Sequence, residues 1–429
     1  MLMNIRPRTV LAFLALLAVI YFFVKIVSVF WLIIIFNIVL LYINNVFIFA
    51  YLEFKGKEKP VPVKWPFVSI VIPNYNGAKT IAQCVNSCIE MEYRGKKEII
   101  VVDDGSTDSS KDELQKIKGI KIIFKKKNAG KAAALNDGIK IAKGEYVAAI
   151  DSDTFPTKIA LVKMIPKFGD NVAAVTGLVR AYKPTTFIEK IQEVEYLISF
   201  GFFQTVLAEI NGILVTPGPM SVFKRSVLLE IGGFDEKNIT EDMEIALRLQ
   251  KHRYKIAAAP EAVIYTDVPK KISHLIRQRT RWYRGKFVNT RKYFEMVLNP
   301  KYGEFGMFSF PFSLVADALA ILLIVVTIAA NIEGVFQYLG FVVSWLALNA
   351  GISGLVPAAP VLHSSIYFYV FTIIMYSILV YLSHKFVNDN ISIWKMPEII
   401  FYLFVYGFFI SFVYFISFFK EINSSDYIW

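Results

Sequence analysis

The sequence has too few cysteines and histidines for two common kinds of structural centre. Its 429 residues include two cysteines, Cys84 and Cys88, and four histidines. Two cysteines exclude the disulfide framework of a small secreted protein. The thiol and imidazole groups are also too few and too scattered to predict a zinc site.

A glycine-rich phosphate-binding loop is missing as well. Neither the G-x-G-x-x-G nor the Walker pattern follows the first predicted strand, at residues 67–73. Such loops bring backbone amides to the phosphates of a nucleotide. A Rossmann dinucleotide site and a P-loop are therefore both disfavoured.

Charge is nearly absent near the N-terminus, where Lys25 is the one charged residue between positions 10 and 52. A bilayer span needs about 20 apolar residues, so this run is long enough for two spans, or for one long tilted helix. Arg6 and Arg8 precede it and four lysines follow it between positions 55 and 64. Two spans would place both basic flanks in the cytosol.

The C-terminal third is apolar in the same way, and three spans are predicted, at residues 305–330, 365–383 and 397–419. A fourth apolar segment, 335–362, contains Pro357 and Pro360 and either crosses the bilayer or re-enters it. The residues AVILMFWYC make up 55% of the chain. Soluble domains have about 45–50% apolar residues even with glycine counted, so a wholly soluble protein is excluded.

The charged middle of the chain alternates short apolar runs with amphipathic stretches. Strands are predicted at residues 67–73, 98–103, 120–124 and 146–151, and helices at residues 77–91, 109–118 and 129–143. This alternation predicts an α/β domain with a mostly parallel sheet. The predicted organisation is a transmembrane region at 1–54, a cytosolic domain at 55–269, an amphipathic interface helix within 270–304 and a second transmembrane region at 305–429.

Polar residues follow three of the predicted strands: Asn74, Tyr75 and Asn76 after the first, Asp103 and Asp104 after the second, and Asp151 and Asp153 after the fourth. Ligands of open parallel sheets bind outside the carboxyl ends of the strands. Carboxylates that converge at one edge repel each other unless a cation lies between them. Mg²⁺ typically binds through one or two carboxylates together with substrate phosphates.

Several motifs carry a resemblance to one family. They are Asp103-Asp104-Gly105-Ser106, Asn128-Ala129-Gly130-Lys131, Asp151-Ser152-Asp153, Gly218-Pro219-Met220-Ser221, Gly232-Gly233-Phe234-Asp235, Thr240-Glu241-Asp242 and Gln278-Arg279-Thr280-Arg281-Trp282. In this order they resemble the family 2 glycosyltransferases of GT-A fold. The motifs resemble the membrane-bound synthases of hyaluronan, chitin, cellulose and poly-N-acetylglucosamine, and the overall plan is most similar to the poly-N-acetylglucosamine and hyaluronan enzymes. The resemblance covers residues 66–285.

The resemblance implies a nucleotide-sugar site made of Asn74, Tyr75, Asn76, Asp103, Asp104, Lys131, Asp151 and Arg281. Either Asp103 or Asp104 would bind the uracil and ribose. Lys131 opens a predicted helix, where phosphate would offset the unfavourable meeting of a cation with the positive helix end. Asp153, supported by Asp151, would hold Mg²⁺ or Mn²⁺.

The resemblance also implies that Asp242 is the general base, which takes the proton of the acceptor hydroxyl. Glu241, Gln278 and Trp282 would bind the acceptor, with the indole ring of Trp282 as a platform beneath a sugar. One base and no protein nucleophile predict direct displacement, so that an α-linked nucleotide sugar gives a β-linked product.

Two functions follow as expectations. The first is a processive transferase that extends a β-linked polysaccharide from a UDP-sugar and exports the chain, and the second adds one sugar to a polyprenyl phosphate or a diacylglycerol. UDP-N-acetylglucosamine and UDP-glucose are the candidate donors. The expected location is the plasma membrane, and the oligomeric state stays open. The net charge of +12 fits an anionic leaflet and a phosphate-bearing donor, and no nucleic-acid-binding motif accompanies it.

Overall fold

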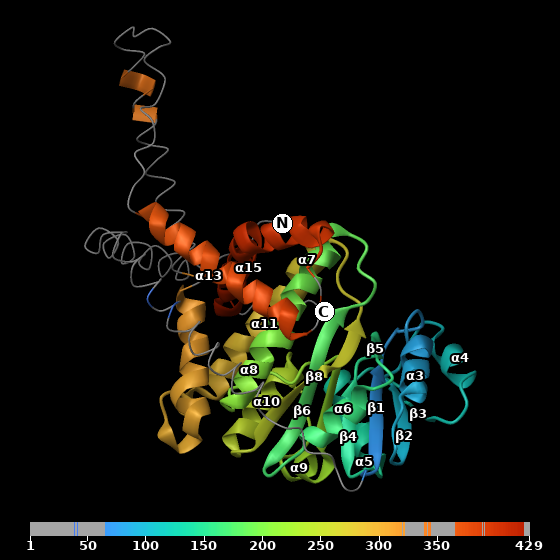
Figure 1. The fold of residues 1–429 in the computed structure, drawn as a ribbon. Helices are drawn as coiled ribbons and strands as arrows, with labels where there is room; N and C mark the ends of the chain where they lie inside the picture. The colour runs from blue at the N-terminus through green and yellow to red at the C-terminus, as the bar shows by residue number, and fades with distance from the viewer. Residues whose placement is uncertain are drawn as a thin grey trace.

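The computed structural model describes residues 65–319, 365–387 and 391–423, together with positions 38, 41, 321, 339, 340, 342–344 and 389 (Figure 1). The predicted N-terminal spans lie outside the described residues apart from Ile38 and Leu41. The apolar segment 335–362 and the end of the predicted span 305–330 lie mostly outside them as well.

Four parallel strands begin and end within one residue of the predicted ones: β1 (Val68–Asn74), β2 (Lys97–Asp103), β3 (Lys121–Phe124) and β4 (Tyr146–Ile150). The helices that connect them are α3 (Ile81–Glu90), α4 (Ser110–Gln115) and α5 (Lys131–Ile141). All seven residues of β1 are buried, as expected of a central strand covered on both faces.

Helices cover both faces of this half of the sheet. Ile70 and Ile72 of β1 pack against α3, whereas Val71 packs against α5, because successive side chains of a strand point to opposite faces. Cys84 and Cys88 are fully buried on α3. They take part in this packing, as part of the core on the α3 side.

The second half of the domain adds β5 (Thr154–Pro156), β6 (Val172–Ala181), β7 (Met220–Lys224) and β8 (Lys255–Thr266). The strand order is β3-β2-β1-β4-β7-β6-β8-β5. Strand β7 runs antiparallel to both β4 and β6, and β5 runs antiparallel to β8. The sheet is therefore mixed, and the predicted parallel order holds from β3 to β4 and again for β6 beside β8.

The helices of the second half are α6 (Ala160–Met164), α7 (Phe187–Tyr196), the π-helical turn η2 (Leu197–Phe203), α8 (Gln204–Glu209), α9 (Arg225–Glu230) and α10 (Glu241–Lys251). The amphipathic helix predicted within 270–304 is α11 (Ile272–Lys292). Short turns follow it at η3 (Phe294–Met296), η4 (Pro300–Tyr302) and η5 (Phe305–Ser309).

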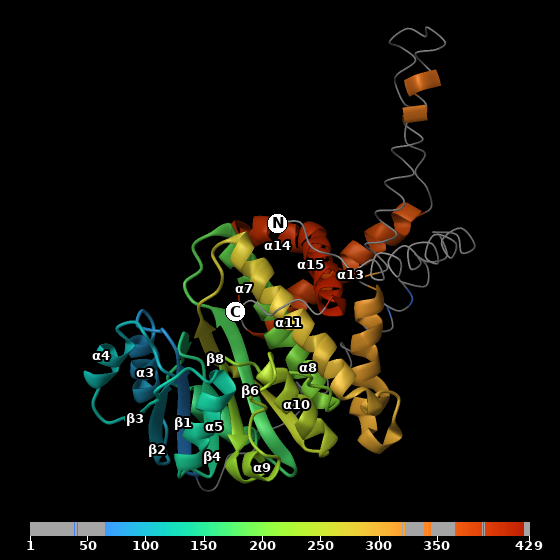
Figure 2. The ribbon, with the colours of Figure 1, turned by 180° about the vertical axis from the view of Figure 1, so that it is seen from behind.

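The C-terminal helices lie beyond one end of the sheet, beside α7 and α11 (Figures 1 and 2). They are α13 (Ser365–Phe386), η7 (Ile393–Lys395), α14 (Met396–Phe401), η8 (Tyr402–Tyr406) and α15 (Gly407–Ile422). In the described part of the chain, the continuous helix Met396–Ile422 is the one long and apolar enough to cross a membrane, by length and composition. Membrane spans on both sides of the domain stay a prediction.

Candidate active site

The first two strands end in a buried hydrogen-bonded pair. Asp103 is fully buried, and its carboxylate accepts hydrogen bonds from Asn74 Nδ2 at 2.9 Å and from the backbone amide of Ser106 at 3.2 Å. The parallel register sets Asn74 beside Asp103. The predicted proximity of the two strand ends is thus present, and the Asp103 carboxylate joins them.

Asp104 fixes the loop that precedes α5. Its carboxylate accepts hydrogen bonds from the amides of Ala129 at 3.0 Å and Gly130 at 2.7 Å, and it pairs with Lys125 Nζ at 2.8 Å. Gly105 has a φ of +76°, and a Cβ there would lie 2.9 Å from the nitrogen of Asn128. Asp104 therefore positions the start of the helix that opens with Lys131.

Asn76 and Tyr75, the other two residues predicted to bind the nucleotide after the first strand, differ in their surroundings. Asn76, at a φ of +52°, accepts a hydrogen bond from the Thr107 amide at 2.8 Å, and its own amide donates to Ser106 Oγ at 2.9 Å. Its side chain thus joins two loops. Tyr75 is 49% exposed, so its ring is open to contact with a bound base.

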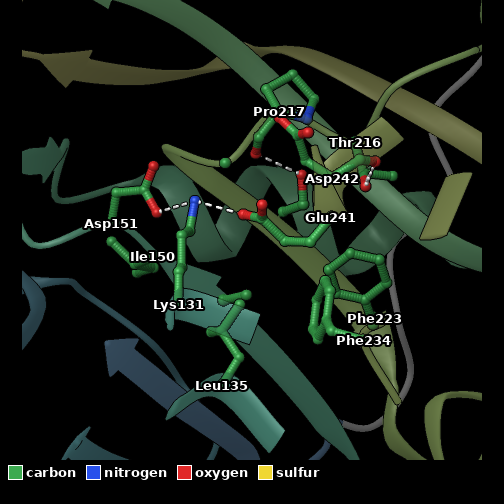
Figure 3. A pocket seen from close by; sticks show the side chains of 13 residues that line it. Lys131, Leu135, Ile150, Asp151, Thr216, Pro217, Phe223, Phe234, Glu241 and Asp242 are labelled. Carbon is green, nitrogen blue, oxygen red and sulfur yellow. Dashed lines mark hydrogen bonds and ion pairs between the residues drawn. The ribbon is translucent and has the colours of Figure 1, made fainter. Parts of the chain in front are cut away.

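Lys131 joins carboxylates from two distant parts of the chain (Figure 3). Its Nζ lies 2.6 Å from Asp151 Oδ1 and 2.8 Å from Glu241 Oε1. Burial alone would lower the pKa of Lys131, but the neighbouring carboxylates raise it above its ordinary value. Burial alone would likewise raise the pKa of Glu241, but the Lys131 cation lowers it. Lys131 stays protonated and Glu241 ionised around neutral pH.

A glycine is required beside this cluster. A Cβ on Gly218 would lie 2.8 Å from both Asp151 Oδ2 and Lys131 Nζ. Gly218 belongs to the loop before β7, and its neighbour Pro219 accepts a hydrogen bond from the Asp151 amide at 3.3 Å. This close approach gives a physical reason for the glycine in the sequence motif.

Asp242 lies in the first turn of α10, next to Glu241. Burial and the Glu241 carboxylate raise the pKa of Asp242 to about 6, against the opposing effect of Lys131 and Arg281. Its backbone oxygen accepts hydrogen bonds from the amide of Thr216 at 3.2 Å and from Thr216 Oγ1 at 2.9 Å. A carboxyl group with a pKa near working pH suits proton transfer.

Four of the predicted site residues line one cavity: Lys131, Asp151, Glu241 and Asp242 (Figure 3). Thr216, Gly218, Phe223 and Phe234 form part of its remaining wall. Thr216 was not predicted, because its contact with Asp242 spans 26 positions of sequence and no motif includes it.

Asp153 follows Asp151 by two residues in the sequence. Asp151 lines the cavity, whereas Asp153 does not. Burial raises the pKa of Asp153 to about 7, with further repulsion from Asp151 and Asp267 and an opposing effect of Lys131. Among residues with described positions, no three His, Cys, Asp or Glu side chains are grouped to hold a metal. Two repelling carboxylates are nevertheless a donor set that fits Mg²⁺ or Mn²⁺ when substrate phosphates complete the coordination.

The predicted residues of α11 contact either the loop before α10 or the neighbouring Arg279. Arg281 Nη1 donates to the backbone oxygen of Ile239 at 3.3 Å. Gln278 Oε1 accepts from Arg279 Nη1 at 2.7 Å. The guanidinium carbon of Arg279 lies 4.0 Å from the ring centroid of Trp282, within cation–π range.

Arg279 is the buried centre of this group and was missed by the sequence analysis. It is 0% exposed, and its Nη2 lies 2.5 Å from Glu195 Oε2 of α7. The hydroxyl of Tyr406 donates to the same Glu195 oxygen at 2.8 Å. Nothing in the sequence distinguishes Arg279 from the other arginines of a basic helix, since its partner lies 84 positions away.

Comparison with known proteins agrees with this geometry. Residues 69–232 match the family model described as Glycosyl transferase family 2. The poly-beta-1,6-N-acetyl-D-glucosamine synthase of Staphylococcus epidermidis is 34% identical over 223 residues, which are 51% of this chain and 54% of that protein. The enzyme of the same name from Staphylococcus aureus (strain COL) is 33% identical over 226 residues, with the same shares. The chain thus matches about half the length of these curated relatives.

A solved structure shares the fold. The mannosyltransferase from Pyrobaculum calidifontis, in complex with GDP-Man and Mn²⁺, aligns with 91% of this chain and 99% of its own, with a TM-score of 0.55 and 19% identity. The mixed sheet described above is therefore GT-A-like. The predicted GT-A-like fold and α/β architecture are confirmed at this level, and residues 69–232 match the model of the predicted family.

The buried Arg279–Glu195 pair yields a stability prediction. Glu195→Ala would leave a buried cation without its carboxylate, and breaking a buried pair in this way costs about 3–5 kcal/mol. We expect a clearly lower melting temperature for the detergent-purified variant. Glu195→Met combined with Arg279→Met should recover much of the loss.

The matched control is Glu113→Ala, which removes the exposed pair of Glu113 with Lys116 at 2.7 Å. Such pairs contribute about 0–1 kcal/mol. A melting temperature for Glu195→Ala equal to that of Glu113→Ala would contradict a stabilising role for the buried pair.

Proposed function

We propose that this chain, whose residues 69–232 form a glycosyl transferase family 2 domain, is an inverting glycosyltransferase that extends a β-linked polysaccharide from a UDP-sugar. The observation that carries the proposal is the meeting of Lys131, Asp151, Glu241 and Asp242 in one cavity at the end of β4. The names of the relatives make UDP-N-acetylglucosamine the donor of choice, with UDP-glucose as the alternative.

The donor would lie along the carboxyl ends of β1, β2 and β4. The uracil ring of the donor would stack near the exposed Tyr75, above the loops that Asn74, Asn76 and Asp103 join. Asp104 acts through the loop before α5, because it fixes the backbone next to Lys131. Lys131 and Arg281 would face the diphosphate, since their cations can pair with its oxygens.

Asp151 and Asp153 would hold the divalent cation, which stabilises charge on the departing diphosphate when bound. The mannosyltransferase of similar fold is described with Mn²⁺, which supports a divalent cation, either Mg²⁺ or Mn²⁺. A cation would also relieve the repulsion from Asp151, which adds to the effect of burial in raising the pKa of Asp153.

The two adjacent carboxyl groups of α10 have different roles. Glu241 is paired with Lys131 and its pKa is lowered, so it is a poor base and would position the acceptor. Asp242 has a pKa of about 6 and would accept the proton. Opposite pKa shifts in neighbouring groups are a guide to acid–base assignment.

The chemical step is a direct displacement. The acceptor oxygen forms a bond to C1 of the donor sugar while the bond from C1 to the diphosphate oxygen breaks, and the hydroxyl proton passes to Asp242. UDP leaves with the bonding electron pair. An α-linked donor then gives a β-linked product.

The acceptor would approach from α11. Arg279 covers one face of the Trp282 ring at 4.0 Å, so a sugar would pack on the opposite face, with Gln278 nearby on the same helix. The cytosolic domain would work at the plasma membrane, next to the C-terminal helices that α11 contacts.

The function is tested by incubating purified protein with UDP-N-acetylglucosamine, UDP-glucose and Mn²⁺, and by measuring UDP release together with product mass. We expect a ladder of β-linked polymers, and chelation of the cation should stop UDP release. One discrete glycolipid would instead support transfer of a single sugar to a lipid. Absence of UDP release with every donor would contradict the transferase proposal.

The base is tested by Asp242→Asn, which keeps the shape of the side chain but cannot accept the proton. We expect a rate loss of roughly 10²–10⁴-fold with nearly unchanged UDP binding. In the wild type, transfer should be constant above pH 7 and should fall as the pH drops through about 6, because protonated Asp242 is inactive.

The control is Asp112→Asn, since Asp112 also lies in the first turn of a helix, α4, but is exposed. It should retain wild-type rates. Full activity of Asp242→Asn, or a pH profile without a fall near pH 6, would rule out Asp242 as the base.

A further inference from the structure

One face of α11 contacts the loop that leads into α10. Positions 281, 285 and 289 are four residues apart and therefore share that face, and Tyr293 follows directly after the helix. Arg281 Nη1 donates to the backbone oxygen of Ile239 at 3.3 Å, one residue before Thr240. Further contacts from α11 reach Thr240, which precedes the proposed base Asp242, and Glu244, which follows it.

Asn289 holds Thr240 from outside its own helix. Asn289 is 0% exposed, and its Nδ2 donates to Thr240 Oγ1 at 3.0 Å. Its Oδ1 accepts from Asn238 Nδ2 at 2.7 Å. Thr240 occupies the N-cap position of α10, yet its side chain makes no capping hydrogen bond to that helix. The start of α10 is therefore fixed by a side chain of α11.

Gly285 allows this contact to form. A Cβ at Gly285 would lie 2.2 Å from Thr240 Oγ1 and 2.4 Å from Thr240 Cγ2. Atoms do not approach so closely without displacement, so a residue with a side chain would push Thr240 away. The separation of α11 from Thr240 is thus set by the absence of a side chain at position 285.

A second attachment lies two residues after Asp242. Glu244 is fully buried and accepts hydrogen bonds from Lys292 Nζ at 2.7 Å and from the Tyr293 hydroxyl at 2.6 Å, both near the end of α11. Asp242 therefore lies between two residues, Thr240 and Glu244, that α11 holds.

The other side of α11 packs against the C-terminal helix α15. The rings of Tyr283 and Tyr414 are 4.9 Å apart, and those of Phe287 and Phe418 are 5.6 Å apart. The same helix therefore contacts the segment that carries the proposed base and the apolar helix next to the domain.

We propose that α11 positions the general base, with Gly285 and Asn289 as the positioning residues that fix Thr240 and so the Asp242 carboxyl. This inference rests on the proposed function, because it assumes that Asp242 accepts the proton. Neither residue lines the cavity, and both act through Thr240.

A displaced base should affect the chemical step more than donor binding. Apart from Arg281 of α11, whose guanidinium bonds Ile239, the proposed donor residues lie at the ends of β1, β2 and β4 and on α5, away from the contact between Gly285 and Thr240. A misplacement of about 1 Å by a remote mutation can cost roughly 10²-fold in rate. The charged groups that face Asp242 are Glu241 of α10, Lys131 of α5 and Arg281 of α11. Altered spacing among them would also move the acidic limb of the pH–rate profile.

The test measures kcat, the KM for the UDP-sugar, UDP affinity and the pH–rate profile for Gly285→Ala and Asn289→Ala. We expect kcat to fall roughly 10- to 100-fold, with the donor KM and UDP affinity within about twofold and the acidic limb shifted. Asn289→Ala adds no atoms, so it carries the test if Gly285→Ala fails to fold.

Two controls match these changes. Thr290→Ala alters the next residue of α11, about 100° around the helix. Gly407→Ala adds a methyl group to a helical glycine that has no described neighbour within 4 Å of the added atom. Both should keep wild-type kinetics.

Asp242→Asn is measured in the same assay. If it is inactive while Gly285→Ala and Asn289→Ala have wild-type kcat, the positioning inference is overturned and the proposed function stands. A parallel loss of UDP affinity and kcat in both variants would indicate general structural damage and would also overturn it. Full activity of Asp242→Asn would overturn the base assignment and the inference together.

Discussion

The site depends on one cation held between carboxylates from two elements. Lys131 Nζ lies within 2.8 Å of oxygens of both Asp151, after β4, and Glu241, at the start of α10. Without this positive charge the acidic groups would repel each other across the cavity. Its own position is set by Asp104, which binds the loop before α5, and by Gly218, whose missing side chain leaves room for the pair.

The second constraint is mechanical and comes from α11. This helix contacts the segment around Asp242 through Asn289 and Gly285, and it contacts α15 through aromatic rings. Arg279, buried within it, stacks on Trp282 and pairs with Glu195. The proposed acceptor platform and the proposed base are therefore carried or held by the same helix.

The sequence predicted the first half of the domain closely, because runs of β-branched residues alternate there with amphipathic segments, and β1 to β4 begin and end within one residue of the expected positions. The antiparallel strand β7 was not predicted, because it begins inside the motif Gly218-Pro219-Met220-Ser221 and its partners β4 and β6 are brought beside it only by the fold. Asp242, Lys131 and Asp151 were predicted through motif resemblance, and they line one cavity of the structure. Asn289 and Arg279 were not, since their partners lie 49 and 84 positions away and only the folded chain brings them together.

The central claim is that the nucleotide-sugar donor and the general base Asp242 meet in the cavity beside Lys131. The most direct measurement is a cryo-EM structure of the full chain with UDP-N-acetylglucosamine and Mn²⁺, using Asp242→Asn to prevent turnover. The account predicts the cation on Asp151 and Asp153, the diphosphate beside Lys131, and C1 of the sugar facing residue 242. A donor bound outside this cavity, with residue 242 remote from C1, would contradict it.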